Sequence, residues 1–227
     1  QIATVDYALY ILENNVRVDG LQVYITDTTD QQYGILMSGG SGVVDYYVSN
    51  NIVRGVGTYA TDFWTLGIHL DAGPGTARIW NNIVYDFYAS GSLPDRHVGI
   101  GLAVGATQAQ AYIYNNTVYN CYLGFEAYTS PAAFNNIAQD CNNGFNGTFA
   151  GTSDYNISDI AADAPNATFG GGEATVAFFD EENDDFHLAV LDTAARDQGF
   201  DLSSDVTLAF STDIDGGTRP FGLAWDI

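Results

Sequence analysis

The sequence of 227 residues predicts an all-β solenoid, in which short strands stack coil upon coil and an irregular C-terminal segment follows. Three observations lead to this prediction. A phrase built on an Asn-Asn pair recurs along the chain, and a second phrase built on a glycine recurs in phase with it. The acidic residues are 23 Asp and only five Glu. Because Asp suits turns better than helix surfaces, long helices are not expected.

The first phrase places a hydrophobic residue two positions before and two positions after an Asn-Asn pair. The four clear copies contain Asn50-Asn51, Asn81-Asn82, Asn115-Asn116 and Asn135-Asn136. Looser copies lie at 18–23 and 153–158. Because strands this short cannot each bury a face alone, neighbouring copies must stack into a solenoid.

The second phrase pairs a glycine with a large hydrophobic residue. Its copies are Gly34-Ile35, Gly67-Ile68, Gly99-Ile100, Gly124-Phe125 and Gly144-Phe145. Strand alternation sends the Ile or Phe inward and the next residue outward. The outward residues are then Leu36, His69, Gly101, Glu126 and Asn146.

The recurrence of an Asn-Asn pair in each repeat has a physical reason. Asn tolerates the left-handed backbone of a sharp corner, and its amide can bond to the Asn of the next coil. We therefore expect an internal ladder of Asn51, Asn82, Asn116 and Asn136.

With these repeats the sequence resembles the right-handed parallel β-helix proteins. This superfamily contains pectate lyases, polygalacturonases, alginate epimerases, phage tailspikes and many surface proteins. The resemblance covers roughly residues 10 to 160, and it implies about six coils over residues 1–160. One coil architecture hosts all of these activities, so the resemblance implies a fold rather than a function.

Residues 161–227 leave the repeat and are expected to form a capping segment packed on the coils. The segment resembles the tail of many secreted bacterial β-helix proteins, with its D-F-x-L, T-D-x-D-G-x-x-R-P and D-I-G-A phrases. Here these phrases begin at Asp185, Thr212 and Asp226. Because the sequence stops before the Gly-Ala, we expect the natural protein to continue past Ile227. The first coil likewise has no capping helix ahead of it, and an open coil is a template for association.

The charge balance excludes some partners. Six Arg and no Lys stand against 28 acidic residues, giving a net charge of -22. Binding a phosphate backbone needs clustered cations, so duplex nucleic acid is excluded. No apolar run is long enough to span a membrane. Such acidity indicates a secreted or surface protein or a salt-adapted source, and we expect a secreted or cell-surface location.

The two cysteines, Cys121 and Cys141, each lie five residues after the second Asn of their repeat. They therefore occupy equivalent places in adjacent coils, where strands lie about 4.8 Å apart. That spacing falls within the range of Cα separations of a disulfide, roughly 4.4 to 6.8 Å. The pair is either a staple across two coils in an oxidising compartment or two small buried thiols.

In the enzymes that this fold resembles, substrate lies along the strand of the glycine phrase. Asp71 and Glu126 stand two coils apart, about 10 Å between backbones. This is near the carboxyl separation of inverting glycosidases, roughly 6.5 to 9.5 Å. His69 or His97 is a candidate proton carrier, and Arg96 a candidate partner of a uronate carboxylate. Against catalysis, the chain has no Lys base and no complete polygalacturonase phrase, and exposed acids are typical of solvated surfaces.

Aromatic and amide side chains beside these acids indicate a sugar-binding groove. The binding candidates on its strands and rim are Trp64, Tyr88, Tyr128 and Asn146. Three further aromatic residues, Trp80, Tyr114 and Phe134, occupy equivalent outward positions in successive coils. This aromatic stripe is either ordinary stacking between coils or a contact patch for a subunit or sugar chain.

No cofactor is expected apart from calcium as a weaker candidate. The acidic residues Asp180, Asp184, Asp213 and Asp215 offer oxygen ligands, although none follows an EF-hand spacing. The alternative interpretation is solvated turns in the tail.

The leading hypothesis is an extracellular structural or adhesive β-helix within a larger surface or filamentous assembly, associating with itself or with other surface proteins. The alternative is a polysaccharide-active enzyme, of glycosidase or lyase type, or a carbohydrate-binding module that uses the groove over the Gly-Ile strand. A viral receptor-binding spike shares the fold, but no feature here selects it.

Overall fold

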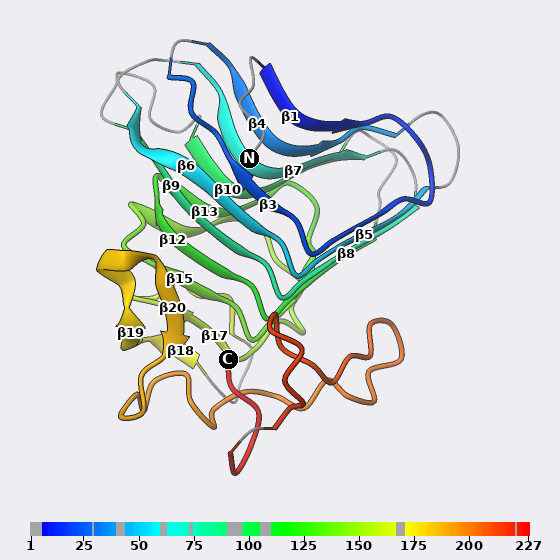
Figure 1. The fold of residues 1–227 in the computed structure, drawn as a ribbon. Coiled ribbons are helices and arrows are strands. Elements are labelled where there is room, and N and C mark those ends of the chain that lie inside the picture. Colours follow the sequence, from blue (N-terminus) through cyan, green and yellow to red (C-terminus); the bar gives the residue numbers. More distant parts are fainter. Residues whose placement is uncertain are drawn as a thin grey trace.

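The protein is an all-β parallel β-helix in a computed structural model (Figure 1). The structure describes residues 6–28, 30–39, 44–59, 63–72, 75–89, 97–104, 110–166, 171–220 and 222–227. Three parallel sheets surround one core, and each coil from β1 to β15 contributes a strand to each sheet in turn. The stack that the Asn-Asn and glycine phrases predict is therefore confirmed.

Sheet A contains β1 (Asp6–Ile11), β4 (Gln32–Met37), β7 (Thr65–Ala72), β10 (His97–Val104), β13 (Leu123–Ala127) and β16 (Asn143–Gly147). Sheet B contains β2 (Arg17–Asp19), β5 (Val44–Ser49), β8 (Gly75–Trp80), β11 (Gln110–Tyr114) and β14 (Ala132–Phe134). Sheet C contains β3 (Gln22–Tyr24), β6 (Ile52–Tyr59), β9 (Ile83–Ala89), β12 (Thr117–Cys121), β15 (Ile137–Gln139), β17 (Asn156–Ser158) and β18 (Gly171–Glu173). Because β18 pairs with β17, the stack continues past residue 160.

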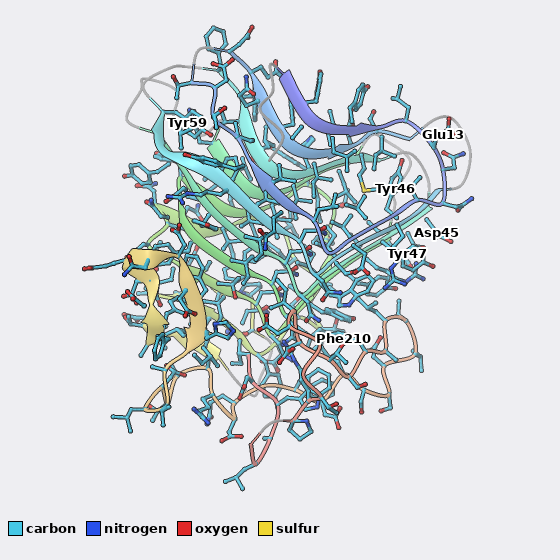
Figure 2. The ribbon with its side chains drawn as sticks, in the orientation of Figure 1. Glu13, Asp45, Tyr46, Tyr47, Tyr59 and Phe210 are labelled. Atoms are coloured by element: carbon cyan, nitrogen blue, oxygen red, sulfur yellow. The ribbon has the colours of Figure 1, made fainter. Side chains whose placement is uncertain are left out.

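Hydrophobic side chains of equivalent positions form columns inside the coils. The column predicted from the glycine phrase is Ile35, Ile68, Ile100, Phe125 and Phe145, and every member is buried. The rings of Phe125 and Phe145 stack with their centroids 4.8 Å apart. Alternation holds in sheet B as well, where Tyr46 of β5 is fully buried and Tyr47 lies on the outer side (Figure 2).

The glycines before this column are required by close backbone approach. A Cβ on Gly67 would lie 2.7 Å from the carbonyl oxygen of Gly99 in the next coil, and one on Gly99 would lie 2.9 Å from that of Gly124. A side chain at these positions would push the coils apart, so the phrase keeps a glycine in each coil.

The corner between sheets B and C is built by the Asn-Asn pairs. The first Asn of each pair takes the left-handed conformation, with φ from 51° to 56° at Asn50, Asn81, Asn115 and Asn135. The second forms the expected ladder. Its amide nitrogen donates to the amide oxygen of the next coil at 2.9, 2.9, 3.0 and 2.8 Å along Asn51, Asn82, Asn116, Asn136 and Asn156.

The tail packs along the outer faces of sheets B and C (Figure 1). It contains a hairpin of β19 (Phe178–Asp180) and β20 (Asp185–Leu188), joined by a 3₁₀ turn (Glu181–Asn183). Phe178 and Phe186 of the hairpin pack on Ile137 and Tyr85 of sheet C. Leu202, Leu208 and Trp225 cover the outer face of sheet B. The segment therefore runs back over several coils and does not only close the last one.

No helix in the described part of the chain is long and apolar enough to span a membrane.

Candidate functional site

The outer face of sheet A carries the predicted polar column. Register places Leu36, His69, Gly101, Glu126 and Asn146 side by side on β4, β7, β10, β13 and β16. The five positions predicted from the glycine phrase are therefore equivalent in successive coils, and of these Leu36, Gly101 and Glu126 are buried. Gly101 separates His69 from Glu126, so no side chain stands between them in the column.

His69 is the half-buried base of this column. Its ring lies 5.8 Å from the ring of Tyr33 and leans over Gly101, where a Cβ would come within 2.8 Å of Nδ1. Burial lowers the pKa of His69 to about 4, and the negative charge of Asp71 opposes this only in part. The imidazole is therefore neutral at pH 7 and can accept a hydrogen bond from a hydroxyl group.

Glu126 is buried in the same column, with 4% of its surface exposed. The hydroxyl of Tyr128 donates to its Oε1 at 2.7 Å. The ring of Tyr128 is itself 63% exposed, and Asn146 follows Glu126 on the neighbouring strand. The structure thus brings together three predicted residues, a carboxylate, a phenol and an amide, at one end of the face.

Three tyrosines that the sequence analysis did not name, Tyr7, Tyr10 and Tyr33, lie at the other end of the same sheet; Tyr10 is in register with Leu36 of the column, and Tyr7 is in register with Tyr33. Tyr7 stacks on Tyr10 at 4.7 Å and on Tyr33 at 5.3 Å between centroids, and Tyr33 adjoins His69. Tyr7 and Tyr10 are 38% and 46% exposed. The signal was present in the sequence, because Tyr33 directly precedes the first glycine of the second phrase. Tyr33 stands two residues before Ile35, whereas the outward positions were predicted from the residue after each Ile or Phe.

The remaining groove candidates are spread around this face. Asp71 is exposed on β7, two residues beyond His69, and Trp64 directly precedes β7. Tyr88 lies on sheet C, with its ring 6.2 Å from that of Tyr122. Arg96 lies outside the described residues.

His97 does not lie on the rim of the groove. It begins β10, pairs with Thr65 of β7 and is fully buried. Its ring stacks on Tyr59 at 5.2 Å, and its Nδ1 is hydrogen-bonded to the hydroxyl of Thr65. Tyr59 lies at the end of β6 (Figure 2), so this corner of the core holds His97 away from the outer face.

The aromatic stripe is not a surface contact patch. Register confirms that Trp80, Tyr114 and Phe134 are equivalent outward residues of sheet B. Trp80 and Tyr114 are only 6% and 3% exposed, because Leu202, Leu208 and Trp225 of the tail cover them. Phe210 lies 6.4 Å from Trp80 on the same side (Figure 2). The partner of this stripe is the chain's own tail.

The calcium candidates are not gathered into a site. Within the described ranges, no three His, Cys, Asp or Glu side chains lie close enough together to hold a metal ion. Asp184 pairs with Arg54, Asp180 accepts from the amide of Asn183, and Asp215 accepts from His187. Asp213 accepts the backbone N–H groups of Asp215 and Gly217, so it shapes its own turn.

The two cysteines meet across neighbouring coils as free thiols. Cys121 is fully buried, and Cys141 is half-buried beside the same core. Burial raises the pKa of the Cys121 thiol, and the adjacent Cys141 adds to this effect. The pair is thus placed for a staple and is reduced in this structure.

No protein-family model, no curated protein and no solved structure matches this chain.

Proposed function

We propose that this protein is an extracellular adhesive β-helix whose sheet A face binds a polysaccharide. One observation carries the proposal. The rings of Tyr10 and Tyr7 on β1, Tyr33 on β4 and His69 on β7 form a run of neighbouring rings, and register then leads from His69 through Gly101 to Glu126. Aromatic rings offer flat apolar surfaces to sugar rings, and the polar groups beside them suit hydroxyls.

The charge of the face favours a neutral or amino polysaccharide over a polyuronate. Asp71 and Glu126 lie on the face, and the whole chain carries a net charge of -22. The arginines of the described ranges lie elsewhere: Arg17 and Arg78 on sheet B, Arg54 on sheet C, and Arg196 and Arg219 in the tail. A carboxylated sugar chain would therefore be repelled.

We further propose membership in the pectate-lyase-like superfamily and a secreted or cell-surface location. The stacked parallel sheets and the acidic composition support these proposals. Self-association into a filament stays a prediction, and the aromatic stripe no longer argues for it because the tail covers it.

Glycoside cleavage on the same face is the second candidate function. The observation favouring it is the buried carboxylate of Glu126, held by Tyr128 in the column that also contains the neutral His69. A positioned carboxyl group beside a base is what acid–base catalysis requires.

Binding to a panel of polysaccharides tests the proposal. Retardation in affinity gels should be strong for neutral or amino polymers and weak for polygalacturonate. Tyr33→Ala removes the ring between Tyr7 and His69 and should weaken binding roughly tenfold, the value of one or two aromatic contacts. The matched control is Val206→Ser, because Val206 is fully exposed in the tail. Equal binding by Tyr33→Ala and the native protein would refute the proposal.

The same samples separate binding from cleavage. If the face is catalytic, reducing ends or unsaturated ends appear with the polymers that bind, and Glu126→Gln abolishes the products while retaining affinity. Binding without any product assigns the face to adhesion alone.

A further inference from the structure

A pocket of about 400 Å³ lies between the tail and the coils, on the outer side of the Asn corner. Its floor is formed by the start of β9, β12 and β15, and its walls come from β20 and from the turn at 213–215. Neither part forms the pocket alone, because its lining comes from both. The volume is within the range of small-molecule sites and far exceeds that of one water molecule.

One wall of this junction pocket is apolar. Ile83 and Ile137 come from sheet C, and Phe178, Phe186 and Ile227 come from the tail. These side chains belong to the hydrophobic cluster between sheet C and the tail, so the packing around them fixes their positions. Such a wall accepts the C–H face of a ligand and provides no hydrogen bonds.

The other wall is polar, with its side chains already positioned by the tail. The Asp213 carboxylate accepts hydrogen bonds from two backbone N–H groups of its own turn. The Asp226 carboxylate accepts one from the backbone N–H of Asp197 at 2.7 Å. Arg219 is held over the rings of Phe210 and Trp225, with its guanidinium carbon 5.9 and 5.5 Å from the ring centroids. Hydrogen-bond donors and acceptors for a ligand are therefore already in place in the pocket, and the side chains need no large rearrangement to bind it.

The charges of the lining are balanced. Asp213, Asp215 and Asp226 face Arg196 and Arg219, and His187 lies between two carboxylates. An added anion would meet three carboxylates, and an added cation would meet two guanidinium groups. Either charge would lose hydration without gaining a free counter-charge.

We propose that the junction pocket binds a neutral polyol of monosaccharide size, with its C–H face on Ile83 and Ile137 and its hydroxyls on Asp213, Asp226 and Arg219. The site is separate from the sheet A face and does not depend on the polysaccharide proposal. Because the ligand contacts coils and tail together, it stabilises the docked tail.

Calorimetric titration and thermal unfolding with neutral monosaccharides and cyclic polyols test this site, with a uronate and an amino sugar as charged probes of the same size. A neutral probe should bind saturably and raise the melting temperature. Ile214→Trp fills the pocket from the half-buried turn and should weaken that binding at least tenfold. Asp226→Asn keeps the shape of the wall and should weaken it several-fold.

Two controls keep the site distinct from the sheet A face. Val206→Ser should bind like the native protein, and Tyr33→Ala should leave monosaccharide binding unchanged whatever it does to polysaccharide binding. The proposal is overturned if no neutral probe saturates, if a charged probe binds more tightly, or if a folded Ile214→Trp and Asp226→Asn both retain native affinity.

Discussion

At the scale of single residues, the two members of each Asn-Asn pair have different tasks. The second Asn is buried and extends the ladder between coils. The first turns the corner with a positive φ, and in three of the four pairs its amide donates to the tail. Asn81 donates to the carbonyl of Thr212 at 2.8 Å, Asn115 to that of Asp226 at 3.1 Å and Asn135 to that of Phe200 at 2.8 Å. One dipeptide therefore builds the coils and docks the tail.

Removing one ladder residue should destabilise the whole stack. The amide nitrogen of Asn116 donates to the carbonyls of Ile79 and Tyr114 and to Asn136, and its oxygen accepts from Asn82. Asn116→Ala leaves several buried groups unpaired, at roughly 1 to 3 kcal/mol each before relaxation. Urea unfolding should show a loss of about 3 kcal/mol or more.

The matched control for the ladder is Asn142→Ala, because Asn142 is exposed and contributes only its backbone N–H to the coil. We expect a change within about 0.5 kcal/mol. Similar losses for both variants would show that the ladder has no special role in stability.

At the scale of elements, an irregularity in β6 shifts the alignment of this strand with its neighbours. Strict counting aligns Val56 with Phe87 and Cys121, but the register of β6 shifts between Arg54 and Gly57. Gly57, with φ of 87°, pairs with Phe87 instead. The column still ends inside the core, because Phe87 and Cys121 are both fully buried. An extra residue in a strand alters pairing without changing the repeat around it.

Oxidation of the cysteine pair should strengthen the link between β12 and the coil that follows. Cys121 and Cys141 are 20 positions apart, so a cross-link restricts a loop of that length in the unfolded chain. The chain-entropy relation assigns about 3 kcal/mol to such a loop. Intact mass should fall by the two hydrogens lost, and the urea midpoint should rise only in the oxidised sample.

Cys141→Ser serves as the control for the staple, because Cys141 is half-buried and its replacement removes the cross-link with little loss of core packing. Its midpoint should be independent of oxidant. If the native protein forms no intramolecular disulfide under an oxidant that modifies free thiols, the pair is only part of the core.

At the scale of the whole molecule, a histidine clasp joins the hairpin to the rest of the tail. His187 of β20 has Asp185 at Nδ1 and Asp215 at Nε2, the second at 2.8 Å. Both ring nitrogens must carry protons to donate to both carboxylates, so the geometry requires the imidazolium. These hydrogen bonds to Asp185 and Asp215 raise the pKa of His187.

The attachment of the hairpin to the turn at Asp215 should therefore weaken with rising pH. The folded-state pKa of His187 lies above the unfolded value of about 6.5, so its contribution is complete below that value. It is lost as pH rises through the folded-state pKa, when the imidazolium releases a proton. The protein has three His residues, which makes titration of the ring resonances by NMR direct. His187 should titrate above 6.5 and His69 near 4.

Asp215→Asn isolates the clasp, since it keeps the size of the side chain and removes one negative charge from His187. The pKa of His187 should then fall towards its ordinary value, and the loss of hairpin protection from hydrogen exchange above neutral pH should become smaller. An unchanged titration curve in Asp215→Asn would contradict the clasp.

Much of the coil architecture could be predicted because the same pattern of inward, outward and corner residues recurs in successive coils. The inward Ile and Phe column, the outward His69 and Glu126, and the Asn ladder all follow from short periodic spacing. The prediction for His97 was wrong. The sequence placed it in a loop at the rim of the groove, but it is the first residue of β10, pairs with Thr65 and is buried in the core. Trp80 and Tyr114 depart from the prediction because an outward position on a strand can still be covered by another segment.

The sequence by itself thus determined the repeating unit and its inward and outward faces, since strand alternation is a local property of the chain. Only the tertiary structure decided where the tail lies, because residues 174–227 have no repeat from which docking can be counted. That docking buries the aromatic stripe, gives Asn81, Asn115 and Asn135 their tail partners and creates the junction pocket. Within the described residues the tail packs on sheets B and C, and the polysaccharide face that we propose lies on the third sheet, sheet A.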